Sequence, residues 1–191
     1  MGEKFREEKI SGTTVFDGTL LEVHKDKVKL PNHETATREY INHPGAAVIL
    51  PYTEDGNILM INQYRYPIEQ VTLELPAGKI DPGESPEESI NRELAEEAGY
   101  GADNIVKLGS IFSCVGYSNE KIHLFWGDSL YPHELESDET EKISITRKAP
   151  EELIGMIYSG EIQDAKTQIG LFWANKIFND EETRQQFNIE L

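Results

Sequence analysis

The sequence predicts a mixed α/β protein of the α+β kind, with one main domain and a small N-terminal β-subdomain. Its 191 residues are near the usual size of one domain. Hydrophobic residues make up 38% of the chain and occur in clear apolar runs, which is enough to bury a core and excludes a disordered chain. Short strand-like runs between turn residues are followed by longer helical patterns, so both kinds of element are expected.

The N-terminal β-subdomain is expected to occupy residues 1–44, and the main domain residues 45–191. The first segment contains short apolar or alternating runs separated by turns, which is typical of strands. It is too short to bury a core of its own. Its strands are predicted at 15–16, at 20–23 and around Val28 and Leu30.

The main domain is expected to open with strands at 46–50 and 58–61. Because Glu-Asp-Gly-Asn at 54–57 is a turn sequence, we expect these strands to form a hairpin of the main sheet. A further strand at 71–75 should end at Pro76. The remaining strands are predicted at 105–112 and 122–126, an acidic loop at 133–142, and helices at 150–158 and 166–178.

The clearest helix is predicted over 86–98. Ser85 is a good N-cap, Pro86 suits the first helical position, and Glu88 can complete a capping box. Gly99 supplies the C-terminal stop.

The formal net charge of −17, without any Lys/Arg cluster, argues against a nucleic-acid or anionic-membrane partner. An anionic substrate would then be received by a few arginines or by bound cations. The single Cys114 cannot form an intrachain disulfide, and the charged start of the chain lacks the apolar stretch of a signal peptide. We therefore expect a cytoplasmic protein, in which no run is long enough to span a bilayer.

Three carboxylates share one stripe of the predicted helix, because Glu93, Glu96 and Glu97 are spaced by three and four residues. Like charges at this spacing destabilise a helix by roughly 0.2–0.5 kcal/mol per pair unless a cation lies between them. Oxygen ligands favour Mg²⁺ or Mn²⁺ over zinc. The alternative is an ordinary solvated acidic face, which is how most charge runs in acidic proteins are used.

Residues 78–100, GKIDPGESPEESINRELAEEAGY, resemble the Nudix box, G-x5-E-x7-R-E-U-x-E-E-x-G-U with U a bulky apolar residue. A chance match at this many positions has odds on the order of 10⁻⁸. The resemblance implies the Nudix fold, a mixed β-sheet sandwiched between helices, and a Nudix hydrolase domain at 45–191. The matching residues are Gly78, Glu84, Arg92, Glu93, Leu94, Glu96, Glu97, Gly99 and Tyr100.

The resemblance also implies roles at the site. Glu93 and Glu97 would be the principal metal ligands, Glu96 would assist, and the carbonyl of Ala77 would add one oxygen. Arg92 can hold carboxylates in place with its planar fork. Bound Mg²⁺, or Mn²⁺, would polarise a diphosphate and lower the pKa of an attacking water, which is hydrolysis without a covalent intermediate.

A wider resemblance, from about 15 to 178, is to the ADP-ribose and nucleoside-diphosphate-sugar pyrophosphatase branch. It implies hydrolysis of ADP-ribose to AMP and ribose 5-phosphate. The alternatives are another nucleotide sugar, such as GDP-mannose or ADP-glucose, or a domain that senses ADP-ribose without cleaving it. A damaged box would favour the sensor, and this box is intact. The supporting segments are 37–40, 43–46, 63–65, 74–78 and 164–167.

The branch resemblance suggests substrate contacts outside the box. Arg65 would contact phosphate or nucleotide as a bidentate donor, although an ordinary exposed arginine is the alternative. Arg38 would act similarly and reach the site of a partner subunit. The resemblance implies this, because proteins of the branch are expected to be homodimers with intertwined N-terminal subdomains. Glu74 is counted with the substrate-binding residues, and its role there is expected to be structural rather than catalytic.

Two further regions complete the expected site. The acidic loop lies where the branch carries its general base, with Glu139 as first choice and Glu141 as second; a plain solvated loop is the alternative. Gly116 and Glu120 match the branch at positions that contact the terminal ribose, so the resemblance implies the same contact here. Cys114-Val115-Gly116 stands where the branch has Ser-Pro-Gly, and losing the proline removes a fixed backbone angle.

Overall fold

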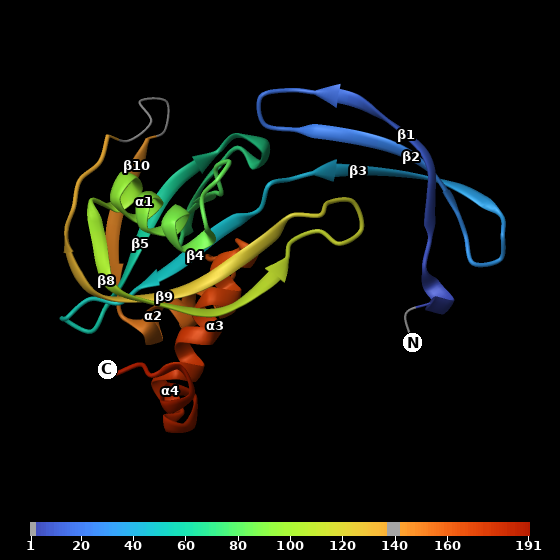
Figure 1. The fold of residues 1–191 in the computed structure, drawn as a ribbon. Coiled ribbons are helices and arrows are strands. Elements are labelled where there is room, and N and C mark those ends of the chain that lie inside the picture. The colour runs from blue at the N-terminus through green and yellow to red at the C-terminus, as the bar shows by residue number, and fades with distance from the viewer. Residues whose placement is uncertain (1–2, 137–141) are drawn as a thin grey trace. The chain divides into compact units, whose positions relative to one another are not determined.

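The computed structural model describes residues 3–136 and 142–191, and its internal contacts divide the chain into two units (Figure 1). The first unit comprises the chain up to Gly45 together with Phe112–Lys121. The second comprises Ala46–Ile111 and Ile122–Leu191.

The first unit is built on the antiparallel sheet β1-β2-β3, with strands Glu8–Asp17, Glu22–Lys29 and Thr35–Asn42. A short 3-10 helix, Glu3–Phe5, precedes it. The strands are longer than predicted, and β3 was not predicted, because most of their residues are exposed and held by ladder hydrogen bonds rather than by apolar burial. The N–H of Ile41 donates to the carbonyl of Tyr117 at 2.8 Å, which joins Phe112–Lys121 to this unit.

The second unit contains two sheets. Strands Ala77–Lys79 (β7), Ala46–Pro51 (β4), Lys121–Pro132 (β9) and Tyr100–Phe112 (β8) form one in the order β7-β4-β9-β8. It is mixed, because β4 pairs with β9 in parallel and with β7 antiparallel. Strands Ile143–Lys148 (β10), Ile58–Arg65 (β5) and Gln70–Glu74 (β6) form the antiparallel sheet β10-β5-β6.

The predicted hairpin between 46–50 and 58–61 is wrong, since β4 and β5 belong to different sheets and meet at the isolated bridge between Tyr52 and Ile58. The turn itself forms as expected. Thr53 closes it, with its Oγ1 donating to the carbonyl of Asn57 at 2.9 Å. The turn carries the chain from one sheet into the other because β4 is buried along almost its whole length and finds its partners in β7 and β9.

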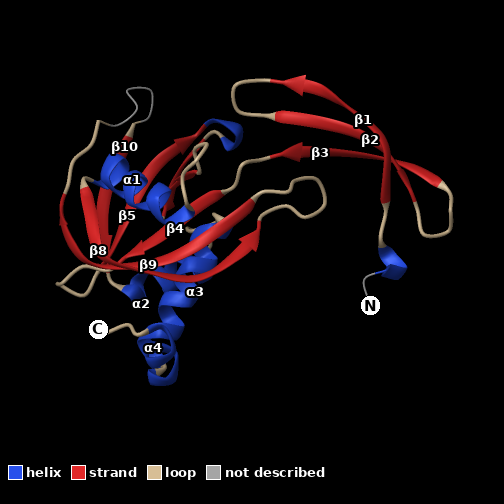
Figure 2. Cartoon of the chain, in the orientation of Figure 1, coloured by secondary structure: helices blue, strands red, loops and turns tan. Residues whose placement is uncertain are grey.

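Helices lie on both sides of the β4 layer, as predicted for a sheet sandwiched between helices (Figure 2). Ala47 and Ile49 of β4 pack with Ile90 and Leu94 of α1. Val48 and Leu50, which point to the other face, belong to a larger core with residues of α2 and α3. The helices are Pro86–Ala98 (α1), Pro150–Ser159 (α2), Ala165–Asn179 (α3) and Glu181–Phe187 (α4).

Helix α1 has the bounds that its end signals predict. Ser85 accepts from the N–H of Glu88, and the Glu88 side chain accepts from the N–H of Ser85, so the capping box is complete. Gly99 ends the helix at φ 70°, in the left-handed region that favours glycine. Across residues 3–136 and 142–191, every helix is too short or too polar to cross a membrane.

Candidate active site

Helix α1 and strand β7 bring the predicted metal ligands together. The carboxylate of Glu97 accepts a hydrogen bond from the N–H of Ala77 at 2.9 Å. Glu93 lies against Gly78, where an added Cβ would come within 1.9 Å of the Glu93 carboxyl carbon. The glycine is therefore needed for close approach of strand and helix, not for its backbone angles.

Arg92 is the centre of the motif. Its guanidinium donates to Glu84 from Nε at 2.8 Å and from Nη2 at 3.0 Å. From Nη1 it donates to Glu93 at 2.9 Å and to Glu96 at 2.8 Å. Nη2 also reaches the carbonyl of Lys79 at 3.3 Å, which ties the loop before the helix to its middle. One cation thus holds three carboxylates that would otherwise repel one another.

These contacts shift the titration of both partners. Hydrogen bonds from Arg92 lower the pKa of Glu84 from 4.5 to about 2. Hydrogen bonds to Glu84, then the charge of Glu93 and hydrogen bonds to Glu93 and Glu96, raise the pKa of Arg92 above its ordinary value. The Arg92–Glu84 pair is therefore ionised throughout the physiological pH range.

The oxygen donors of this cluster suit Mg²⁺ or Mn²⁺. Within 3–136 and 142–191, however, no group of three or more His, Cys, Asp or Glu side chains is arranged as a metal cage. Arg92 donates hydrogen bonds to Glu93 and Glu96, and the N–H of Ala77 donates to Glu97, so all three carboxylates already have hydrogen-bond partners. A cation would have to compete with these donors for the carboxylates.

A second charged cluster surrounds Glu74, which is almost fully buried at 1% exposure. Arg65 binds it through Nε and Nη2, both at 2.7 Å, in a bidentate pair. Lys166 at the start of α3 also donates to Glu74, and Asp164 accepts from Lys166 at 3.0 Å. Burial alone would raise the pKa of Glu74, but Arg65 and Lys166 hold it at about 2.

The two clusters share one region of the second unit. Hydrogen bonding to Glu74 raises the pKa of Arg65, and the charges of Glu97 and Asp164 contribute further. Arg65 is therefore within electrostatic reach of the motif carboxylates. Lys166 is a functional candidate that sequence reasoning missed, and the only sequence signal for it is the resemblance of the segment 164–167 to the branch.

The other expected substrate contacts lie in the first unit. Arg38 donates from Nη2 to Glu7 at 2.5 Å and from Nη1 to the carbonyl of Thr37 at 3.0 Å. Glu120 accepts from the hydroxyl of Ser113 and lies 3.7 Å from Nε2 of His43. Their meeting with the motif at one site stays a prediction.

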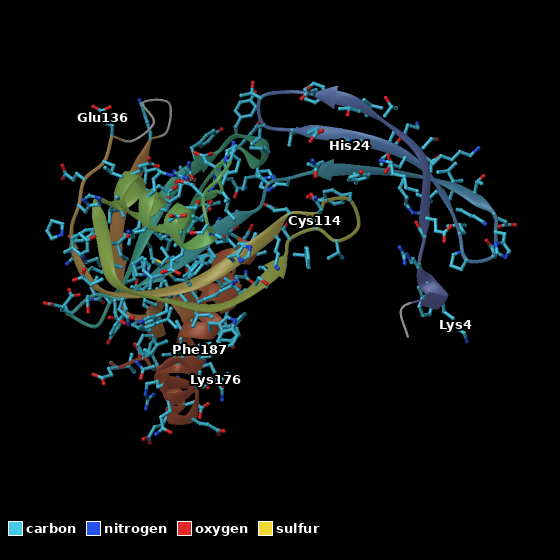
Figure 3. All side chains as sticks on the ribbon, in the orientation of Figure 1. Lys4, His24, Cys114, Glu136, Lys176 and Phe187 are labelled. Atoms are coloured by element: carbon cyan, nitrogen blue, oxygen red, sulfur yellow. The ribbon has the colours of Figure 1, made fainter. Side chains whose placement is uncertain are left out.

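Gly116 lies in a turn that starts at Cys114 (Figure 3), whose carbonyl accepts from the N–H groups of Tyr117 at 3.0 Å and Ser118 at 2.9 Å. In this chain, backbone hydrogen bonds hold the turn in shape, whereas the branch has a proline at this point. A Cβ at Gly116 would meet nothing within 4 Å, so local packing does not require glycine there.

Both candidate bases, Glu139 and Glu141, lie outside the described residues. The segment that leads toward them is anchored at the end of α1, where the N–H of His133 donates to the carbonyl of Gly99 at 2.9 Å.

Comparison with known proteins supports the interpretation of the motif. The NUDIX domain model matches residues 41–166. An ADP-ribose pyrophosphatase of Bacillus subtilis (strain 168) is 34% identical over 86% of this chain and 90% of its own. A methanol dehydrogenase activator of Bacillus methanolicus is 35% identical over 90% of this chain and 94% of its own.

A solved structure agrees with these matches. The crystal structure of an ADP compounds hydrolase superposes with a TM-score of 0.82 and 26% identity, covering 96% of this chain and 97% of that one. The family model spans well over half of the chain, including the whole motif. The chain therefore belongs to the Nudix family and is a hydrolase of its pyrophosphatase class.

Proposed function

We propose that this chain hydrolyses the pyrophosphate bond of a nucleoside diphosphate sugar, with ADP-ribose as the leading substrate and AMP and ribose 5-phosphate as products. The observation that carries the proposal is the intact motif, in which Arg92 gathers Glu84, Glu93 and Glu96 beside Ala77 and Glu97. The names of the ADP-ribose pyrophosphatase and the ADP compounds hydrolase support this substrate class.

In this proposal Glu93, Glu97 and the carbonyl of Ala77 hold Mg²⁺, with Glu96 assisting. When bound, the ion neutralises charge on the diphosphate and lowers the pKa of water. Arg92 orients the carboxylates through its hydrogen bonds to Glu84, Glu93 and Glu96.

Other residues act on the substrate. Arg65 binds a phosphate, while Glu139, or Glu141 in its place, accepts the proton of the attacking water. Gly116 and Glu120 contact the terminal ribose. Water then adds to one phosphorus, and the bridging oxygen leaves with the other phosphate.

Hydrolysis of another nucleotide sugar, such as GDP-mannose or ADP-glucose, is the second candidate. The turn at Cys114 favours this candidate. The segment assigned to the sugar lacks the expected proline and is held by backbone hydrogen bonds instead, so its shape can suit a different sugar. The net charge of −17 argues against nucleic acid or an anionic membrane as the partner.

We also propose the assembly and the location. Residues 1–44 would form a dimerisation subdomain and 45–191 the Nudix hydrolase domain of a cytoplasmic homodimer. Arg38 would then act at the site of the partner subunit.

A substrate panel tests the function. Purified protein is incubated with ADP-ribose, GDP-mannose and ADP-glucose, each with Mg²⁺, with Mn²⁺ and with EDTA. The nucleoside monophosphate and sugar phosphate released are measured. Turnover highest with ADP-ribose and abolished by EDTA is expected. Binding of ADP-ribose without any turnover would instead identify a sensor and overturn the proposal.

A further inference from the structure

Glu74 joins three parts of the second unit at one buried carboxylate. Arg65 at the end of β5 binds both of its oxygens, Thr72 of β6 donates to Oε1, and Lys166 of α3 donates to Oε2. The Glu74 side chain is only 2% exposed, whereas that of Arg65 is 38% exposed. The carboxylate of Glu74 is therefore buried, while the guanidinium of Arg65 that it binds is accessible to solvent.

The bidentate pair fixes how Arg65 faces its surroundings. An arginine has five N–H donors in one plane. Glu74 accepts one from Nε and one from Nη2, so three remain for other partners, on the edge that includes Nη1. That edge can form a second fork of the kind that binds phosphate oxygens.

The start of α3, which carries Lys166, is held firmly against the chain next to Glu74. The side chain of Thr167, which is fully buried, accepts from the N–H of Leu75 at 3.0 Å. Further along α3, a Cβ on Gly170 would come within 2.5 Å of the Leu75 side chain, so the helix packs closely against the residue that follows β6. The start of α3 is thus fastened to the residue next to Glu74.

Charge balance gives Lys166 a second effect. Arg65 and Glu74 alone form a neutral pair, with little attraction for an anion. Lys166 adds a second cation to the same carboxylate, and its own partner Asp164 is the N-cap of α3, accepting from the N–H of Thr167 at 2.9 Å. The helix N-terminus partly offsets the charge of that carboxylate.

We propose that Lys166 is a positioning residue for Arg65: by holding Glu74, it sets the direction in which the guanidinium presents its remaining donors to an anionic diphosphate. This inference rests on the proposed function, in which Arg65 binds phosphate. Lys166 itself touches no reacting atom.

The variant Lys166→Met removes the charge and nearly keeps the side-chain length. Lys176→Met is the matched control, because Lys176 lies on the same helix and forms an exposed ion pair with Asp180 at 2.6 Å. Kinetics with ADP-ribose and Mg²⁺ should show KM raised about tenfold in Lys166→Met, with kcat changed less than about threefold, and neither changed in the control. Lys166→Gln, which can still donate to Glu74, serves if the methionine variant does not fold.

A second readout does not depend on turnover. The Nε–H resonance of Arg65, assigned by its loss in Arg65→Lys, should be slow to exchange with solvent in the wild-type protein. In Lys166→Met it should shift and exchange faster. Kinetic constants and a resonance that match those of Lys176→Met would overturn the inference. If the wild-type protein cleaves no nucleotide sugar, the proposed function fails, and the resonance alone still decides whether Lys166 positions Arg65.

Discussion

Arg92 and Glu84 form two parallel hydrogen bonds across eight residues of sequence, at 2.8 and 3.0 Å. They fasten the loop after Gly78 to the middle of α1. Because the pair lowers the pKa of Glu84 from 4.5 to about 2, its stabilisation is fully present above pH 4.5. It is lost as the pH falls toward 2.

The first prediction follows from this pair. Glu84→Gln should lower the unfolding temperature near pH 7, and the difference from the wild-type protein should shrink as the pH falls from 4.5 toward 2. Thermal unfolding followed by circular dichroism across this range measures it. Glu87→Gln, at an exposed position in the first turn of α1, is the control. A difference that is constant with pH would show that the pair does not stabilise the fold electrostatically.

The second prediction concerns the metal ligands. Glu93→Gln and Glu97→Gln should each abolish most turnover with Mg²⁺ and leave the fold intact, because a glutamine at 97 can still accept from the Ala77 N–H. Removing one anion from a crowded cluster should also leave thermal stability without metal unchanged or raised. Near-normal activity in either variant would contradict the assignment.

Gly78→Ala is the third test. The new Cβ would overlap the Glu93 carboxylate, so that ligand must move or the strand must shift. A displacement of about 1 Å at a catalytic group can cost on the order of 10²-fold in rate, and we expect a loss of that size in kcat. Gly155→Ala in α2, where a Cβ meets nothing within 4 Å, should leave the rate unchanged. Equal activity of the two variants would show that Glu93 does not act from this position.

The fourth prediction separates proton transfer from metal binding. If Glu139 is the base, Glu139→Gln should lower kcat by roughly 10²–10⁴-fold with little change in KM or metal affinity. Loss of a metal ligand would instead be partly rescued by excess Mg²⁺. Glu141→Gln provides the comparison. Should the double variant change kcat by no more than a few-fold, the base lies elsewhere, with Glu97 and Glu120 as the next candidates.

The fifth prediction is that the protein is a dimer at micromolar concentration. Most side chains of β1 and β3 are exposed in one chain, and a three-strand segment of this length buries little core by itself. Sedimentation velocity should therefore give twice the mass of one chain. Deleting residues 1–44 should yield a monomer. A monomeric full-length protein would remove the role proposed for Arg38 across the interface.

Local signals made part of the fold predictable from the sequence. Helix α1 has the predicted bounds because Ser85, Pro86 and Gly99 each specify a helix end through their own backbone chemistry. Strand β10 was not predicted, because its exposed, alternating residues give only a weak apolar pattern. The hairpin prediction failed because sheet membership depends on partners distant in sequence.

The candidate site was likewise predictable only where its residues are close together in the sequence. The motif carboxylates and Arg92 lie within 20 residues, so their spacing on a helix could be read directly. Glu74 and Lys166 are 92 residues apart, and only the docking of α3 on β6 brings them together. In sequence Lys166 has only Asp164 close by, and one lysine near one carboxylate is too common on protein surfaces to indicate a functional residue.

The alternation along β4 has a practical meaning for engineering this enzyme. Its odd-numbered side chains Ala47 and Ile49 support the helix that carries the carboxylates, while Val48 and Leu50 support the opposite layer. Volume changes at the even positions repack against α3 instead, and they reach the proposed site only through Lys166 at the start of that helix. The same change one residue along would tilt α1 and misplace the carboxylates, so attempts to stabilise the protein should use one face of this strand and leave the other untouched.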